Sequence, residues 1–160
     1  DILAFCEAVH ISDANVIGYS DGGNLALWLV VKAPEVFQKI VAISPNTLAS
    51  ATTERALTSI HRILAQLTRL RRFGLPFAKQ IMRFKLMLTD TGITETDLRS
   101  VRTRVMLLYA ERDMVKEEHI LDLAKWIPNA RVEKIAGCNH LNIPYQDRTI
   151  TAIREFLQEE

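Results

Sequence analysis

Hydrophobic and polar positions follow two different periods along this chain. Three stretches carry apolar residues three or four positions apart, which predicts amphipathic helices: residues 1–10, 117–126 and 145–158. Four shorter apolar runs predict strands, most of them buried: residues 15–19, 39–44, 104–110 and 131–136. A further helical pattern starts at Asn24 and stops at Pro34. Because strands that alternate with helices favour a parallel sheet covered on both faces, we predict an α/β fold with about four parallel strands.

The alternation is interrupted between the second and third predicted strands by a long helical stretch, residues 53–88. Its pattern breaks near Gly74 and Pro76, where a helix cannot continue smoothly. It is also strongly basic, since its eight Lys and Arg residues are accompanied by the single acid Glu54. These cations could attract an anionic substrate or a membrane surface, although a solvated helix face explains the same pattern. We interpret residues 50–92 as a helical insert within a single domain that spans the whole chain.

Composition and charge exclude several classes of protein. The 160 residues carry a formal net charge of +1, which gives no overall field for nucleic acid, so no nucleic-acid partner is expected. No apolar run reaches the roughly 18 residues that a membrane-spanning helix needs. The two cysteines, Cys6 and Cys138, lie far apart and form no metal-binding cluster, and we expect neither a metal nor a cofactor. Free thiols are typical of a reducing compartment, which favours a cytoplasmic location.

The most informative motif is the pentapeptide Gly18–Gly22, which has the pattern G-x-S-x-G with Ser20 at its centre. It follows a predicted strand and precedes a predicted helix. A serine at such a sharp turn is exposed, and the free N–H groups of the helix can stabilise an oxyanion beside it. A phosphate-binding turn is the alternative, but no Lys-Ser/Thr pair follows and the glycine spacing does not fit a dinucleotide site. The motif therefore predicts Ser20 as a nucleophile.

A nucleophilic serine requires a base, and four histidines are available. His10 and His61 lie on predicted helices and His119 lies early in another, where surface or packing roles are expected. His140 differs because it lies in a glycine-containing loop, residues 137–140, beyond the last predicted strand. Parallel α/β sheets place their functional residues in the loops at the carboxyl ends of the strands. We therefore predict His140 as the base.

The base in turn needs a carboxylate that orients it. Asp113 comes shortly after the third predicted strand, so it should lie at the same edge of the sheet as His140. The chain order Ser20, Asp113, His140 is the order expected of this type of fold. Glu111 and Asp90 remain alternatives for the acid. They rank lower, because Glu111 comes early in the turn and Asp90 lies in the insert.

Three segments, in this order, resemble the alpha/beta hydrolase fold family, in particular its esterase and peptidase-like branches. Residues 16–27 resemble the nucleophile elbow and residues 107–113 the acid strand and turn. Residues 127–130, followed by residues 137–140, resemble the approach to the catalytic histidine. The resemblance covers essentially the whole chain. Two positions depart from the pattern, since family members often have glycine in place of Glu111 and a small residue in place of Asn139.

The resemblance implies a serine hydrolase that acts on a carboxylic ester or a related acyl substrate through an acyl-enzyme. Ser20 would attack the acyl carbonyl, His140 would remove its proton, and Asp113 would hold the imidazole. Asp21 would provide one oxyanion donor through its backbone N–H. The implied partner is a small acyl molecule and no cofactor is implied, while amide, thioester and lactone hydrolysis stay open. In this family an insert such as residues 50–92 commonly forms a cap over the active site.

The resemblance also implies a partial fold. The family's sheet has eight strands, and the four predicted here match its second half, so we expect that the N-terminal half is lacking. Strand 15–19 should then form an open apolar edge that could pair with another chain, including a second copy. The early loop that supplies the second oxyanion donor has no counterpart here. Since one such donor is worth about a hundredfold in rate, we expect this chain alone to be a weak or inactive enzyme.

Two other functions stay open at this stage. A non-catalytic member of the fold could bind a small ligand or a partner, although an intact set of Ser20, Asp113 and His140 argues against it. A cofactor-free haloperoxidase-like enzyme could keep the same three residues, so the sequence separates it poorly from a hydrolase.

Overall fold

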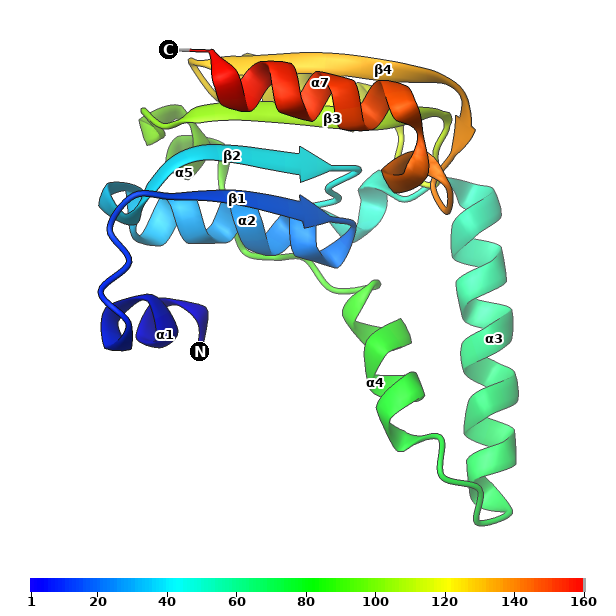
Figure 1. The fold of residues 1–160 in the computed structure, drawn as a ribbon. Helices are drawn as coiled ribbons and strands as arrows, with labels where there is room; N and C mark the ends of the chain where they lie inside the picture. The colour runs from blue at the N-terminus through cyan, green and yellow to red at the C-terminus, as the bar shows by residue number, and fades with distance from the viewer. Residues whose placement is uncertain (160) are drawn as a thin grey trace.

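A computed structural model describes residues 1–159, and its centre is a four-stranded sheet (Figure 1). The strands lie side by side in the order of the sequence: β1 (Ala14–Tyr19), β2 (Phe37–Ile43), β3 (Arg104–Arg112) and β4 (Ala130–Asn139). Every neighbouring pair is parallel. The predicted α/β fold with a parallel sheet of about four strands is therefore confirmed.

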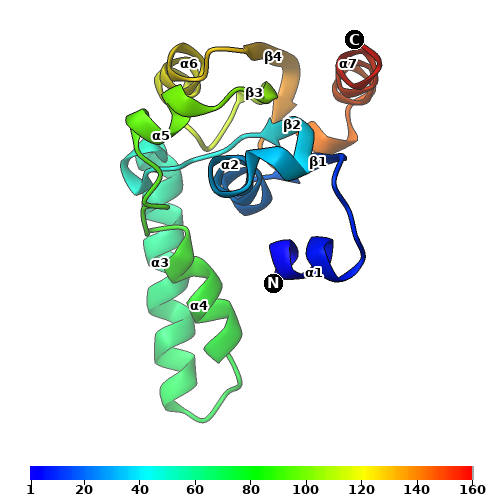
Figure 2. The same ribbon diagram turned by 90° about the vertical axis from the view of Figure 1, so that its left-hand side faces the viewer.

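Helices cover both faces of the sheet, as Figure 2 shows. One face carries α2 (Asp21–Lys32), α5 (Glu95–Ser100) and α6 (Glu117–Trp126), and the other carries α7 (Asp147–Gln158). Helix α1 (Ile2–Ala8) precedes β1. Three short 3-10 turns complete the connections: Pro34–Val36, Ala49–Ala51 and Ile143–Tyr145. Because helices lie on both sides, the central strands have no solvent-facing side.

The central strands show why their sequences read as continuous apolar runs. Successive side chains of a strand point to opposite faces. In β2, Ile40 and Ala42 belong to the core beneath α2, whereas Val41 and Ile43 belong to the core beneath α7. All four side chains are at most 3% exposed. A strand that is buried on both faces therefore needs apolar residues at consecutive positions.

The last strand corrects one sequence prediction. The loop expected at residues 137–140 is still strand up to Asn139, and only His140 lies beyond it. Gly137 has a positive φ of 73°, and the register between β3 and β4 shifts near this point. The Glu111 carboxylate accepts the Gly137 N–H at 2.9 Å, and the Arg112 guanidinium donates to the Gly137 carbonyl. Side-chain bonds from the neighbouring strand thus hold an irregularity that the sequence marks only as a glycine.

The insert forms two helices, α3 (Glu54–Arg72) and α4 (Ala78–Leu86), with the predicted break around Gly74 between them. Gly74 adopts a φ of 84°, which favours glycine. The two helices pack against each other, and Ile60 of α3 and Ile81 of α4 are buried. Together, as the α3–α4 hairpin (residues 54–86), they extend away from the sheet (Figures 1 and 2).

Strand β1 lies at the edge of the sheet and, within residues 1–159, pairs only with β2. Its Ile17 side chain is 53% exposed. The open apolar edge expected from the sequence is present, and its backbone groups are available for another strand. In the described part of the chain, no helix has both the length and the apolar character needed to cross a bilayer.

Candidate active site

Ser20 occupies a strained turn between β1 and α2. Its φ of 54° and ψ of −118° are rare for a residue with a side chain, and such strain is concentrated at functional sites. Its backbone N–H donates to the Ile43 carbonyl at 2.8 Å, which ties the turn to the end of β2. A Cβ atom on Gly18 would lie 2.0 Å from the Gly22 carbonyl oxygen, whereas a Cβ on Gly22 would meet nothing within 4 Å. The turn therefore requires glycine at position 18 and not at position 22.

The three residues predicted from the sequence lie together at the carboxyl edge of the sheet. The His140 Nδ1–Asp113 Oδ1 distance is 2.7 Å and the His140 Nε2–Ser20 Oγ distance is 3.1 Å. An ionised carboxylate only accepts hydrogen bonds, so Nδ1 of a neutral His140 must carry the proton. Nε2 is then the acceptor for the Ser20 hydroxyl. This Ser20–His140–Asp113 array has the arrangement that proton removal from the serine requires.

The Asp113 carboxylate is held by further donors at the end of β3. Oδ2 accepts the Ser44 hydroxyl at 2.5 Å and the Ala110 N–H at 2.8 Å, and Oδ1 accepts the Met114 N–H at 2.7 Å. Burial alone would raise the pKa of Asp113. The hydrogen bonds from His140, Ser44 and Ala110 outweigh burial and hold the pKa below its ordinary value. Asp113 is therefore ionised at neutral pH.

Two residues that the sequence analysis did not single out support the array. The Tyr19 hydroxyl donates to the His140 carbonyl at 2.5 Å, and the two rings lie 5.3 Å apart. Ser44, with a positive φ of 50°, directly follows β2, and its hydroxyl donates to Asp113. Tyr19 stands at a variable position of the G-x-S-x-G motif. Ser44 has only the Ser-Pro sequence at a strand end as a signal, so neither role could be assigned without the fold.

The alternatives considered from the sequence lie elsewhere. Glu111 accepts the Gly137 N–H, and Asp90 accepts the Ala49 N–H at 2.7 Å, so each carboxylate supports a backbone turn. His10 and His61 are exposed. His119 is buried and packs, as expected, beneath the loop that follows β2.

Asp21 is the first residue of α2, directly after Ser20. Backbone N–H groups in the first turn of a helix have no acceptor within the helix, and they lie at the positive end of its dipole. The Asp21 N–H can therefore receive a negative oxygen that forms beside Ser20. Burial raises the pKa of the Asp21 side chain, and attraction to His140 opposes that rise.

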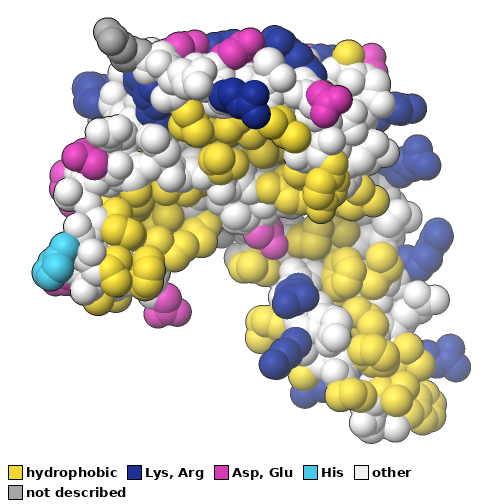
Figure 3. Space-filling model, viewed as in Figure 1, with side chains coloured by type: hydrophobic (Ala, Val, Ile, Leu, Met, Phe, Trp, Pro, Cys, Tyr) yellow, Lys and Arg dark blue, Asp and Glu magenta, His cyan; other side chains and the backbone are white. Residues whose placement is uncertain are grey.

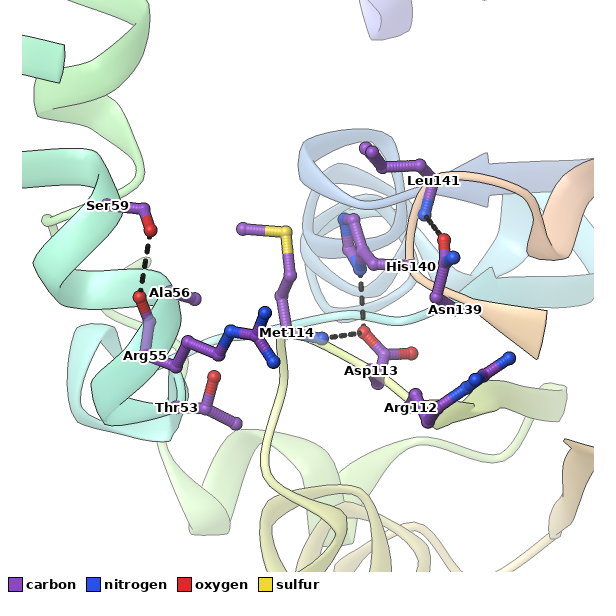
Figure 4. A pocket seen from close by; sticks show the side chains of 10 residues that line it. All are labelled: Thr53, Arg55, Ala56, Ser59, Arg112, Asp113, Met114, Asn139, His140 and Leu141. Atoms are coloured by element: carbon purple, nitrogen blue, oxygen red, sulfur yellow. Dashed lines mark hydrogen bonds and ion pairs between the residues drawn. The ribbon is translucent and has the colours of Figure 1, made fainter. Parts of the chain in front are cut away.

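Two cavities open near the array. The larger, of about 600 Å³, lies between α3 and the ends of β3 and β4 and includes Asp113 and His140 in its wall (Figure 4). The smaller, of about 300 Å³, lies between α2 and the end of α4, beside Asp21, and its apolar wall consists of Leu25, Trp28 and Leu86. In the larger cavity Arg55 extends from α3 toward Met114 (Figure 4). One cavity thus adjoins Asp113 and His140, and the other adjoins Asp21.

The loop between β2 and α3, residues 44–53, is anchored by His119. The Thr47 N–H donates to His119 Nε2 at 3.2 Å, which requires an unprotonated nitrogen. Burial lowers the pKa of His119, and Asp122 opposes this effect. The folded chain therefore binds a proton at His119 less readily than the unfolded chain does.

This difference predicts an acid-dependent loss of stability. The contribution of neutral His119 should be complete above pH about 6.5 and should decline as the pH falls, by at most about 1.4 kcal/mol per pH unit. Urea denaturation across this range measures the effect. His119→Gln should flatten this part of the curve, while His61→Gln, at an exposed site, should leave it unchanged. If the free energy of unfolding depended on pH in the same way for the wild type and His119→Gln, His119 would not be the group responsible.

Comparisons with known proteins show the family of the chain. A family model of the alpha/beta hydrolase fold matches residues 1–80, half of the chain, and the chain therefore belongs to this family. The chain is 25% identical to the 2-hydroxymuconate semialdehyde hydrolase of Pseudomonas putida, a match that covers 98% of this chain. It spans 66% of the length of that relative. Family membership confirms the resemblance found in the sequence.

Solved structures show the same fold. The 2-hydroxy-6-oxo-6-phenylhexa-2,4-dienoate hydrolase from Rhodococcus sp. strain RHA1 matches with a TM-score of 0.77 at 19% identity, over 99% of this chain and 68% of its own. The enol-lactonase from Burkholderia xenovorans LB400 matches with a TM-score of 0.73 at 15% identity, over 99% of this chain and 71% of its own. The described structure is thus a partial alpha/beta hydrolase fold.

Proposed function

We propose that this protein is a serine hydrolase that cleaves a carboxylic ester or a related acyl substrate. The observation that carries the proposal is the Ser20–His140–Asp113 array at a strained strand-to-helix turn, with one cavity beside His140 and Asp113 and another beside Asp21. A buried structural histidine would not need its two nitrogens bound to a hydroxyl and a carboxylate in this order. The arrangement supports activation of the Ser20 hydroxyl by a correctly oriented base.

The reaction would proceed in two halves. Ser20 Oγ bonds to the acyl carbon while its proton moves to His140 Nε2, and the Asp21 N–H donates to the resulting oxyanion. The carbon–oxygen bond to the leaving group then breaks, and His140 returns the proton to the departing alkoxide, which leaves an acyl-Ser20 ester. In the second half, water loses a proton to His140 and attacks that ester. The acid is released and Ser20 recovers its proton.

The substrate class rests on the cavities and on the family. The smaller cavity, with Leu25, Trp28 and Leu86, suits an apolar portion of a small acyl substrate. The relatives are named as hydrolases of a semialdehyde and of an oxo-dienoate and as an enol-lactonase. Among the substrates in these names, only the enol-lactone is an ester. A substrate screen should therefore include lactones, amides and thioesters as well as simple esters. In this proposal residues 50–92 act as a cap, since α3 and α4 contribute to the cavity walls.

Covalent labelling with a fluorophosphonate tests the proposal. The probe should bind one serine, and mass spectrometry of the digested protein should locate it at Ser20. Ser59 lies in the wall of the larger cavity, and its hydroxyl donates to the Arg55 carbonyl, so Ser59→Ala is the matched control. Labelling should persist in Ser59→Ala and disappear in Ser20→Ala.

The same experiment separates the rival functions. A non-catalytic binding protein would leave Ser20 unlabelled, and this outcome would falsify the proposal. A haloperoxidase-like enzyme could also react with the probe. An acyl-Ser20 adduct trapped from an activated ester and then released by water would favour hydrolysis over that alternative.

A further inference from the structure

The α3–α4 hairpin has a charge unlike that of the rest of the molecule. It contains eight cations and the single acid Glu54, so its net charge is +7. The whole chain carries +1, and the remaining residues therefore carry −6. The positive charge is concentrated on one projecting element: Arg55, Arg62, Arg69, Arg71, Arg72, Lys79, Arg83 and Lys85.

None of these eight cations is neutralised within the described residues. All eight are exposed, and none forms an ion pair with a carboxylate in residues 1–159. Elsewhere six of the twelve other cations do so, for example Arg131 with Glu159 at 2.6 Å and Lys134 with Glu117 at 2.8 Å. A solvated helix face normally mixes both signs of charge. The hairpin instead presents an unbalanced positive surface to its surroundings.

Large apolar side chains are exposed among these cations. Phe73 is 75% exposed at the turn of the hairpin, next to Leu75 at 43%, and Met82 on α4 is 67% exposed. Figure 3 shows yellow apolar side chains spread over the hairpin, with dark blue cations along its margins. Ile60 on α3 and Ile81 on α4 are buried, by contrast. The exposed residues are therefore additional to the buried apolar residues of the two helices.

We propose that the α3–α4 hairpin docks on an anionic lipid surface. Amphipathic helices at a bilayer surface combine basic residues, which contact anionic headgroups, with aromatic and aliphatic residues that enter the acyl boundary. Arg71 and Arg72 lie beside Phe73, so the headgroup contacts and the inserting side chain are adjacent at the tip. The phosphates of a nucleic acid would pair with the cations, but they would leave Leu75 and Met82 exposed to water. A second copy of this chain would bring two charges of +7 together.

Docking of the tip would link the lipid surface to the proposed active site through the two helices of the hairpin. Arg55 and Ser59 of α3 line the larger cavity, and Leu86 at the end of α4 lines the smaller one. Both helices run from these cavities to the tip of the hairpin. A substrate dissolved in the membrane would thus reach the cavities along the same element that binds the surface.

Vesicle flotation tests the docking. We expect the protein to float with vesicles of equal parts phosphatidylcholine and phosphatidylserine, to remain unbound with phosphatidylcholine alone, and to dissociate as salt is added. Arg71→Ala combined with Arg72→Ala should weaken binding roughly tenfold or more. The matched control removes two cations away from the hairpin, Arg102→Ala with Arg154→Ala, and should retain wild-type binding.

Insertion of the tip has its own readout. In Phe73→Trp, the added tryptophan fluorescence should shift to shorter wavelength on addition of the anionic vesicles and should be quenched by brominated lipid. The wild-type protein supplies the background from Trp28 and Trp126. The proposal is overturned if the anionic vesicles do not bind at low salt, or if both double variants lose binding equally. Binding of duplex DNA as tightly as the vesicles would also overturn it. So would a dimer of this chain that dissociates in Phe73→Ser while vesicle binding stays intact, because Phe73 would then contact a second copy and not the lipid.

Discussion

Asp113→Asn should slow the reaction of Ser20 with a fluorophosphonate, and any ester turnover, by about 10³- to 10⁴-fold. The carboxylate keeps the proton on His140 Nδ1 and leaves Nε2 free to accept the Ser20 hydroxyl. An asparagine amide can donate to Nδ1 instead. The proton of the neutral imidazole then moves to Nε2, and the base is lost although the side chains still fit. Labelling rates followed by mass spectrometry measure the effect even where turnover is slow.

The two carboxylates that compete with Asp113 in the sequence provide matched controls. Glu111→Gln and Asp90→Asn should each react within about threefold of wild type, because each supports only a backbone N–H away from His140. His140→Ala should lose at least as much as Asp113→Asn, since it removes the base itself rather than the group that orients it. A large loss in Glu111→Gln with little loss in Asp113→Asn would reassign the acid. Circular dichroism of each variant separates a lost base from a lost fold.

Gly18→Ala should destabilise the protein by about 3 kcal/mol, whereas Gly22→Ala should be close to neutral. The added methyl group at position 18 would lie 2.0 Å from the Gly22 carbonyl oxygen, and a backbone atom cannot move aside as a flexible side chain can. At position 22 the methyl group meets nothing within 4 Å, and alanine in the first turn of α2 is the better helix former.

Urea unfolding of the two variants, followed by fluorophosphonate labelling, measures this contrast. Both substitutions add one methyl group to a glycine of the same pentapeptide, so differences in hydrophobicity are matched. We expect labelling of Gly22→Ala at nearly the wild-type rate. Equal destabilisation by the two substitutions would mean that Gly18 does not approach the Gly22 carbonyl oxygen as closely as the structure indicates.

The fold and the array could largely be predicted because their signals are local. Helix α6 begins and ends where its apolar period does, at Glu117 and Trp126. The strand ends also mark where Ser20, Asp113 and His140 must converge, since parallel strands bring their carboxyl ends to one edge.

The remaining features depend on contacts between distant segments. Ser44 and Asp113 are 69 positions apart, and Tyr19 and His140 are 121 positions apart. The hydrophobic periodicity of the sequence does not indicate hydrogen bonds between residues so far apart. The extension of β4 through Gly137 likewise depends on Glu111 and Arg112 of the neighbouring strand. For the same reason, the sequence could indicate the two helices of the insert but not that they project from the sheet.

The contacts that hold the array are separate from those that shape the cavities. Tyr19 and Ser44 fix His140 and Asp113 from the ends of β1 and β2, without help from α3 or α4. The hairpin supplies residues such as Arg55 and Leu86 to the cavity walls. The hairpin can therefore vary in sequence and length, and so alter the cavity walls, while the contacts that hold the Ser20–His140–Asp113 array stay intact. Laboratory evolution of new specificities should accordingly begin with residues 54–86.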